Sequence, residues 1–257
     1  MVYLLITRRL PRIQKADLLI FVLLGLIGIA LNYSSFFLAL KFSNLTTTII
    51  LLYTFPAFVV MGEVIFLGKP LRKGAILAVS LSLVGCLLIT GAYDPSLLIV
   101  NAWGAFFGLA ASLTKAVYTL LGKKLLGRYD AWTTTFFAMG FGAGFLLAYS
   151  GASGVLDVSL PGKAWSYILA IAWIPTLIGY SLFVVALSYL EAGRASIIAT
   201  LEPAAAILLA ALLLEERVDP LQLTGIALVL GSILLLQLLN RPSPDRRTTP
   251  ADQASNQ

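Results

Sequence analysis

The sequence predicts an all-α polytopic membrane protein, and two observations carry this prediction. Of the 257 residues, 59% are hydrophobic and only 12% are charged, and the mean hydropathy is +0.93. A soluble domain carries roughly twice this share of charged residues. Apolar runs also recur along the chain, each about as long as the ~20 residues that a helix needs to cross ~30 Å of hydrocarbon.

The apolar runs and the breaks between them predict eight spanning helices. These cover approximately residues 17–40, 45–66, 73–92, 100–121, 132–149, 164–187, 195–214 and 221–239. A short apolar segment at residues 1–7, which two arginines follow, is expected to be the end of a further membrane helix. The final segment, 241–257, is rich in proline, serine and charge, so we expect a disordered cytoplasmic tail.

The lysines and arginines predict the orientation of the chain. Fourteen of the eighteen lie on the side that would hold both termini: Arg8, Arg9, Arg12, Lys15, Lys69, Arg72, Lys73, Lys123, Lys124, Arg128, Arg194, Arg241, Arg246 and Arg247. Three lie in the opposite loops, Lys41, Lys163 and Arg217, and Lys115 lies within a span. Because cytoplasmic loops carry the excess of positive charge, both termini are expected in the cytoplasm and the protein in the cell (inner) membrane.

The composition excludes several kinds of site. Histidine is absent, and Cys86 is the one cysteine, so neither an intramolecular disulfide nor a metal cluster of thiolates can form. We therefore expect no catalytic residues, no metal site and no cofactor, and the chain is not predicted to be an enzyme. The net charge of +6 is explained by the basic loops, so no nucleic-acid partner is expected.

Two parts of the chain align with each other without a gap. The segment from Tyr33, YSSFFLALKFSNLTTTIILLYTFPA, aligns with the segment from Tyr180, YSLFVVALSYLEAGRASIIATLEPA, and the alignment also pairs Pro56 with Pro203. With one residue inserted, LRKGAILAVSLSLVG then parallels DPLQLTGIALVLG. The helices of Tyr33 and Tyr180 are expected to run in opposite directions. The sequence therefore predicts inverted repeats, which are the architecture of many secondary transporters.

The duplication divides the chain into two unequal units. The first repeat, 1–92, lacks its first helix and most of its second, whereas the second repeat, 93–240, has five helices. Two interpretations stay open at this point. Either the true start lies upstream of Met1, or the chain is a natural truncation.

Two longer stretches carry a resemblance to a known family. FPAFVVMGEVIFLGKPLRKGAILAVSLSLVG and LEPAAAILLAALLLEERVDPLQLTGIALVLGSILL resemble the EamA repeats of the drug/metabolite transporter superfamily. The first copy departs from the pattern, because it has LGKP where the family usually has an acidic residue. The resemblance covers the chain except its tail. It implies a 5+5 inverted arrangement of helices and the transport of small metabolites, amino acids or drugs, mostly outward.

Charged residues and prolines within the spans are the first candidates for a site. Glu202 lies inside an apolar run, where a carboxylate costs about 2.5–3.5 kcal/mol, so a functional role is the default hypothesis. Pro203 is expected to remove a hydrogen bond from its helix, and the matched Pro56 and Pro203 are predicted hinges. Lys115 lies at about the depth of Glu202 and either pairs with it, contacts substrate or extends toward the headgroups. The alternative interpretation is that Glu202 is protonated and hydrogen-bonded in helix packing.

Polar and aromatic residues within the spans complete the predicted substrate site. Tyr33 and Tyr180 match across the repeats and are the best candidates to line a central cavity. Asn32, Thr54, Tyr118 and Trp173 are the further candidates. The alternative is ordinary packing, with each phenol bonded to a backbone carbonyl. Glu63 is expected at the membrane interface near the end of its helix, outside the site.

Together these features predict a secondary carrier that exports small organic metabolites, such as amino acids or drug-like solutes, by alternating access. The expected partners are a small-molecule substrate and the lipid bilayer, and a homodimer is left open. Two alternatives are a degenerate truncated carrier without transport activity and, less in keeping with the composition, a membrane-embedded enzyme that acts on lipid-linked substrates.

Overall fold

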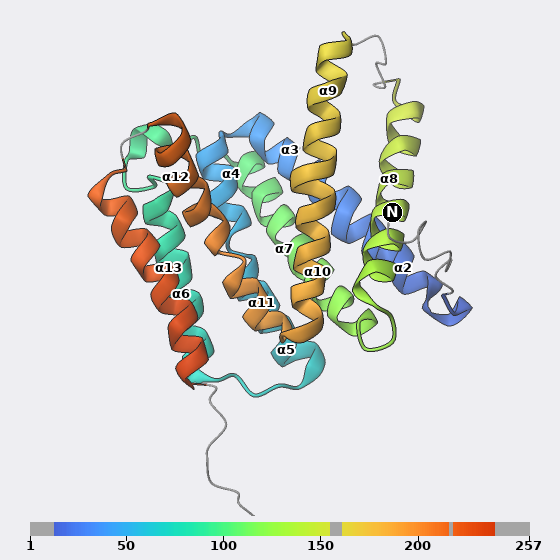
Figure 1. The fold of residues 1–257 in the computed structure, drawn as a ribbon, viewed down its shortest axis with the longest axis horizontal. Coiled ribbons are helices and arrows are strands. Elements are labelled where there is room, and N and C mark those ends of the chain that lie inside the picture. The colour runs from blue at the N-terminus through green and yellow to red at the C-terminus, as the bar shows by residue number, and fades with distance from the viewer. Residues whose placement is uncertain (1–12, 155–160, 216–217, 240–257) are drawn as a thin grey trace, which may run out of the picture.

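The described part of the molecule is entirely helical. The computed structural model describes residues 13–154, 161–215 and 218–239, and these ranges contain helices and connecting turns but no strand (Figure 1). The predicted helix remnant at residues 1–7 and the predicted tail at 241–257 lie outside the described residues. The all-α polytopic fold expected from the sequence is confirmed.

Eight helical stretches cross the described structure, close to the eight that the sequence predicts. Seven are long and apolar enough to span a membrane, and the eighth, Lys73–Ile89, is shorter. Three are uninterrupted helices in the second half: α7 (Ala102–Leu125), α8 (Ala131–Ala152) and α13 (Pro220–Leu239). α6 (Lys73–Ile89) is the uninterrupted helix of the first half. Each of the other four spans consists of two or more helical segments.

Two long spans each contain a π-helical segment. The first span runs from Lys15 to Phe42 and consists of η1 (Lys15–Asp17), α2 (Leu18–Gly25), the π segment η2 (Leu26–Leu31) and α3 (Asn32–Phe42). The sixth span runs from Gly162 to Tyr189 and consists of α9 (Gly162–Ile171), the π segment η4 (Ala172–Ile178) and α10 (Gly179–Tyr189). Short π segments inside α-helices are frequent at functional sites.

Two further spans are broken into half-helices. One consists of α4 (Leu45–Leu52) and α5 (Phe55–Leu67), and the other of α11 (Ala192–Ile198) and α12 (Leu201–Leu214). Pro56 and Pro203 lie in the first turn of α5 and α12, where the backbone N–H has no intrahelical partner. The expectation that Pro203 removes a hydrogen bond from a continuous helix is therefore wrong, because the helix already ends before it.

The irregularities of the two predicted repeats occur at matching positions. The alignment that pairs Tyr33 with Tyr180 brings η2 onto η4 and the α4–α5 break onto the α11–α12 break. It also pairs Gly68 with Glu215, and both cap their helix with a left-handed backbone, at φ 62° and 55°. The first and sixth spans run in opposite directions (Figure 1), which fits an inverted arrangement.

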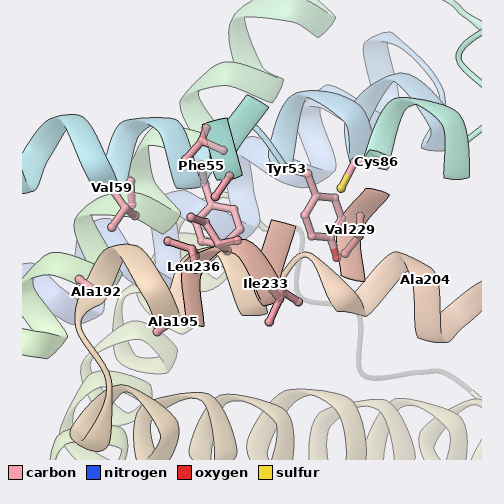
Figure 2. Close-up of a cluster of buried hydrophobic side chains, with 14 of the residues drawn as sticks. Tyr53, Phe55, Val59, Cys86, Ala192, Ala195, Ala204, Val229, Ile233 and Leu236 are labelled. Atoms are coloured by element: carbon pink, nitrogen blue, oxygen red, sulfur yellow. The ribbon is translucent and has the colours of Figure 1, made fainter. Parts of the chain in front are cut away.

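Two apolar clusters hold the helices together. One joins α5 and α6 to α11 and α13 and includes Phe55, Val59, Val229 and Ile233 (Figure 2). The other joins the first span to α7, α8 and α10 around Phe21 and other buried side chains. Within lipid the hydrophobic effect does not drive helices together, so close packing of side chains decides which helix faces meet.

Glycine allows α6 and α13 to approach closely along their length. A Cβ atom at Gly225 would lie 2.7 Å from the carbonyl oxygen of Gly85. The two helices are antiparallel, since Gln222 at the start of α13 donates to the carbonyl of Ile89 at the end of α6. α6 is the last helix of the first predicted repeat and α13 is the last helix of the second. The two repeats therefore pack closely against each other along these helices.

The molecule has two ends, which we name after lysines that mark them. The Lys69 end, at the bottom of Figure 1, holds the start of α2, the end of α5 and the α10–α11 connection. The Lys41 end, at the top, holds the end of α3, the start of α9 and the end of α12. Asn44, Asn101 and Asp130 cap α4, α7 and α8 by accepting hydrogen bonds from backbone N–H groups, which fixes where these helices begin.

Candidate functional site

A pocket of about 380 Å³ lies between the two predicted repeats. Its lining comes from the first span, α4, α7, the sixth span and the α11–α12 break: Gly28, Asn32, Tyr33, Phe36, Leu52, Lys115, Tyr118, Ile171, Pro175, Thr176, Gly179, Tyr180, Phe183, Ala199 and Glu202. Both π segments and one helix break thus contribute to its wall. The size is within the range of pockets that bind small organic molecules.

Tyr33 and Tyr180, which the repeat alignment pairs, meet at this pocket. Their ring centroids are 6.2 Å apart, and the Tyr118 ring packs edge-on against Tyr180 at 5.4 Å. The hydroxyl of Tyr33 lies 3.5 Å from the Thr176 Oγ1 atom. Both tyrosines, which the sequence offered as candidates to line a central cavity, thus lie in the wall of this pocket.

Tyr118 brings an unsatisfied polar atom to the wall of the pocket. Its side chain is 2% exposed, and its hydroxyl has no hydrogen-bond partner among the described residues. Gly28 in η2 makes room for the ring, since a Cβ there would lie 2.6 Å from Tyr118 Cδ2. A buried hydroxyl without a partner costs on the order of 1–3 kcal/mol, and a polar ligand group that reached it would remove this cost.

Lys115, near the middle of α7, lies between the two broken spans. Its ammonium is 4.6 Å from the ring centroid of Phe55 and 5.3 Å from that of Tyr53. On its other side, Lys115 Nζ is 3.9 Å from a carboxylate oxygen of Glu202. Phe55 and Glu202 are aligned positions of the two repeats. Lys115 therefore contacts the same position in both repeats, an aromatic ring in the first and a carboxylate in the second.

The Lys115–Glu202 pair is loose and open to the pocket. The 3.9 Å separation is longer than a direct hydrogen bond, and 70% of the Glu202 side chain is exposed against 22% for Lys115. Lys115 and Glu202 are the charged residues among the described residues that line the pocket. A polar group of a solute can therefore insert between them without breaking a tight contact.

Asn32 is satisfied by helix packing and also reaches the pocket. Its Nδ2 atom donates to the carbonyl of Ala111 at 2.7 Å and to Thr114 Oγ1 at 3.1 Å. The side chain is nearly buried, at 6% exposed. This contact fixes the first span against α7 and holds the adjacent Tyr33 at the pocket wall.

Two of the predicted site residues do not line the pocket. Thr54 lies at the α4–α5 break, where its hydroxyl donates to the carbonyl of Leu51 at 2.7 Å and lies 2.8 Å from Ser112 Oγ. Trp173 lies in η4, is 48% exposed and is not among the lining residues. Pro56 and Pro203 begin the half-helices next to the site but do not themselves line it.

The structure also shows functional candidates that the sequence did not indicate. Gly28, Pro175 and Thr176 line the pocket because they lie in π segments, which have no distinct composition. Glu63, about one turn before the end of α5, is 7% exposed and pairs with Lys69 at 2.8 Å, a contact that was not predicted from the sequence. The spacing of an acid and a lysine across the LGKP turn was the one feature that could have indicated this pair.

The described residues hold no cluster of three or more histidine, cysteine, aspartate or glutamate side chains that would suit a metal ion. The pocket instead offers aromatic faces, one ammonium and one carboxylate, with the unpaired Tyr118 hydroxyl buried beside it. Groups of these kinds can bind and orient a small organic solute.

The profile of the EamA-like transporter family matches residues 1–91 and 102–238 of this chain. An "Uncharacterized transporter" of Archaeoglobus fulgidus is 27% identical over 214 residues, which are 82% of this chain and 75% of that protein. The "Uncharacterized transporter YetK" of Bacillus subtilis is 24% identical over 244 residues, 93% of this chain and 74% of the relative.

A "Probable terminal-alkyne amino-acid exporter" of Streptantibioticus cattleyicolor is 27% identical over 201 residues, 78% of this chain and 66% of that protein. Among solved structures, one crystal structure superposes with a TM-score of 0.72 at 18% identity and covers 88% of this chain and 77% of that one. This likeness supports the fold.

Proposed function

The chain belongs to the EamA-like transporter family, and on this premise we propose that it is a secondary carrier that exports small organic metabolites, such as amino acids or drug-like solutes, by alternating access. The proposed location is the cell (inner) membrane, with both termini in the cytoplasm. The proposed units are the two repeats at residues 1–92 and 93–240.

One observation carries the proposal: the pocket lies between the predicted repeats and takes equivalent residues from both. Tyr33 and Tyr180 face each other in its wall, and Lys115 is flanked by the aligned Phe55 and Glu202. Two related units that run in opposite directions can exchange their packing at the two ends of the molecule. A site at their junction is then reached from one side at a time.

The chemistry of the wall favours a solute with a charged or polar end and an apolar body. Lys115 and Glu202 offer one charge of each sign, and Tyr118 offers a hydroxyl that lacks a partner. Phe36, Phe183 and the paired tyrosines supply apolar and aromatic surface. The printed name of the Streptantibioticus relative, an amino-acid exporter, is consistent with such a cargo.

The proposal is tested by a binding screen. The purified protein in nanodiscs is heated with amino acids, amines and nucleosides, and the thermal midpoint is measured. A solute that binds the native state raises the thermal midpoint. At a free concentration of 100 Kd it increases the free energy of unfolding by about 2.7 kcal/mol. The positive solute is then loaded into vesicles, where counterflow must be seen. Binding without counterflow would leave a solute-binding protein and contradict the carrier.

Glu202 is the proposed residue for proton coupling. It is a titratable carboxylate in the pocket wall, next to Lys115. Glu202→Gln keeps the shape and removes the exchangeable charge, so we expect pH-driven transport to fall to the rate seen without a pH gradient, while counterflow at equal pH continues. Full pH-driven transport by the Glu202→Gln variant would remove this role.

A further inference from the structure

The two ends of the molecule are packed differently around the pocket. At the Lys69 end, α11 of the second predicted repeat packs on α5 of the first, and Gly193 at the start of α11 lies against Val60 and Glu63 of α5. At the Lys41 end, α9 packs mainly along its own continuation and has no buried residue. There α12 packs on α13 and α6 rather than on α3 or α4.

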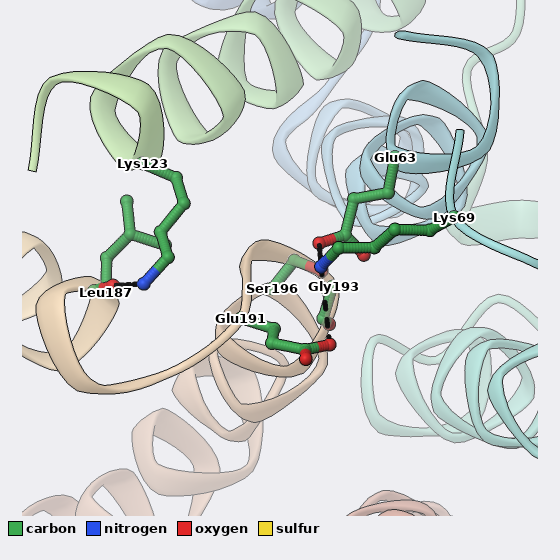
Figure 3. Close-up of polar contacts among 7 residues, drawn as sticks. All are labelled: Glu63, Lys69, Lys123, Leu187, Glu191, Gly193 and Ser196. Carbon is green, nitrogen blue, oxygen red and sulfur yellow. Dashed lines mark hydrogen bonds and ion pairs between the residues drawn. The ribbon is translucent and has the colours of Figure 1, made fainter. Parts of the chain in front are cut away.

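A charged cluster lies across the packed end. Lys69, in the turn between α5 and α6, places its ammonium 2.8 Å from Glu63 of α5 and 3.4 Å from Glu191, which precedes α11 (Figure 3). Glu63 belongs to the first predicted repeat and Glu191 to the second. The lysine thus joins two carboxylates that lie on opposite sides of the repeat junction, and we name this set of three residues the Lys69 latch.

A glycine at the start of α11 leaves room for the Glu63 carboxylate. A Cβ atom at Gly193 would lie 2.6 Å from Glu63 Oε2, so glycine is what allows the carboxylate to reach the start of α11. A second tie across the same end joins Lys123 of α7 to α10, since its ammonium donates to the carbonyl of Leu187 at 2.9 Å (Figure 3).

The latch is accessible to water, so it can open. It lies in a small pocket of about 250 Å³ at the Lys69 end, and the side chains of Lys69 and Glu191 are 38% and 58% exposed. Partial burial lowers the pKa of Lys69, but the hydrogen bond and charge of Glu63, with a smaller part from Glu191, outweigh it, so the pKa lies above its usual value. The lysine is therefore charged at physiological pH. If Lys69 separates from its two glutamates, water in this small pocket can solvate the charges.

From this geometry we propose that Lys69 is a gating residue: in this state the pocket is reached from the Lys41 end, and the Lys69 latch holds the Lys69 end shut until transport requires it to part. This rests on the proposed function, because a gate has meaning only in a protein that alternates. The latch makes the state shown here more populated, since it forms only when α5 and the start of α11 are together.

The test measures from which side the pocket is reached, without any solute. In a Cys86→Ala background, Ala199→Cys reports on the pocket wall, and a small charged methanethiosulfonate reagent is added to either face of sealed vesicles. Ser96→Cys, exposed at the Lys41 end, and Lys124→Cys, exposed at the Lys69 end, identify the face that each preparation presents. The parent is expected to be labelled at position 199 faster from the Ser96 face.

Removing the latch should shift this balance. Lys69→Gln and Glu191→Gln are each expected to raise labelling from the Lys124 face about two- to fivefold and to lower it from the Ser96 face, because a partly exposed ion pair is weak. Lys69→Arg keeps the charge and should behave as the parent. Lys73→Gln, a nearby exposed lysine at the start of α6, is the matched control and should change nothing.

The opposed change on the two faces separates a gate from damage. A variant that only loosens the fold would be labelled faster from both faces. The proposal is overturned if Lys69→Gln matches Lys73→Gln on both faces, or if both rates rise together. Because no solute takes part, a failed binding screen would contradict the proposed cargo and leave this result standing, and the reverse holds as well.

Discussion

At the scale of single residues, the most informative one is Lys115. An ammonium in the interior of a membrane protein needs compensation, and Lys115 has two different kinds: an aromatic face from Phe55 at 4.6 Å and a carboxylate from Glu202 at 3.9 Å. The two partners occupy equivalent places in the two repeats. A small shift of either broken span would therefore change which partner the lysine prefers.

Lys115→Gln should weaken binding of the solute found by the screen by about tenfold, since a hydrogen bond to a charged group contributes roughly 1.5–3 kcal/mol. Titration calorimetry or the thermal midpoint against solute concentration measures this. Lys41→Gln, an exposed lysine in the last turn of α3, is the control and should bind as the parent does. Equal affinity in the Lys115→Gln variant would remove Lys115 from the site.

The pH dependence of the Lys69 latch has a defined sign. The pKa of Lys69 is raised above 10.5 in the folded protein by Glu63 and Glu191, which outweigh the opposing effect of burial. The stabilisation is thus complete below the unfolded pKa and is lost as the pH rises through the folded pKa. We expect the difference in thermal midpoint between the parent and Lys69→Gln to be constant from about pH 8 to pH 10 and to shrink above that. A difference that grows with pH in that range would contradict the assignment.

Sequence reasoning found some site residues and missed others for a physical reason. Tyr33, Tyr180, Lys115 and Glu202 were found because polar groups in apolar runs and matched aromatic positions are visible in the sequence. Trp173 does not line the pocket, because a span that contacts lipid is apolar on all sides and its periodicity does not show which face turns inward. The pairing of Glu63 with Lys69 was missed because the lysine returns through a turn, which spacing along one helix does not show.

At the scale of elements, the spans were predictable and their internal irregularities were only partly so. Length and apolar runs predicted the eight helices, and the matched Pro56 and Pro203 indicated disturbed helices at the right places. The sequence suggested kinks, whereas the structure has breaks with the prolines in the first turn of the next half-helix. The π segments η2 and η4 were not predicted, since one extra residue in a turn leaves no mark in the composition.

The contact of α6 with α13 gives a test at this scale. Gly225→Ala places a methyl group within 2.7 Å of the Gly85 carbonyl and near the backbone N–H of Ile89. Neither helix backbone can yield without a general shift, so we expect a loss of about 1–3 kcal/mol of stability, as is usual for overpacking.

The matched control for Gly225→Ala lies on the same helix. Gly231 has no heavy atom within 4 Å of an added Cβ, so Gly231→Ala should leave stability unchanged or raise it through better helix propensity. Thermal midpoints in nanodiscs measure both. If Gly225→Ala melted no lower than Gly231→Ala, the close approach of α6 and α13 would be refuted.

At the scale of the whole molecule, duplication explains why the pocket lies where it does. Each predicted repeat contributes one span with a π segment and one broken span, and these four irregular spans surround the pocket or its edge. Regular helices, α6 and α13, join the units away from it. Both π segments contribute residues to the pocket wall, and irregular backbone at membrane depth is tolerated where it is buried in protein or lines a cavity.

The orientation of the whole molecule can be tested through its charge. The basic residues gather at the Lys69 end, where Lys69, Lys73, Lys123 and Lys124 lie in or beside the connections. From the positive-inside rule we expect the Lys69 end in the cytoplasm and the Lys41 end outside. With this orientation, the proposed opening would face outward and the Lys69 latch would be a cytoplasmic gate.

Whole cells that carry Lys124→Cys or Ser96→Cys in the Cys86→Ala background distinguish the two orientations. An impermeant thiol reagent added to intact cells should label Ser96→Cys and leave Lys124→Cys unlabelled until the membrane is opened. The physical reason is that moving the lysine-rich loops across the bilayer is opposed during insertion, whereas the Ser96 connection carries no basic residue between Asp94 and Ala102. Labelling of Lys124→Cys but not of Ser96→Cys in intact cells would show the opposite orientation. The Lys41 end would then face the cytoplasm, and the Lys69 latch would be an outer gate. Labelling of both sites in intact cells would indicate dual insertion, which a bias of fourteen basic residues against three makes unfavourable.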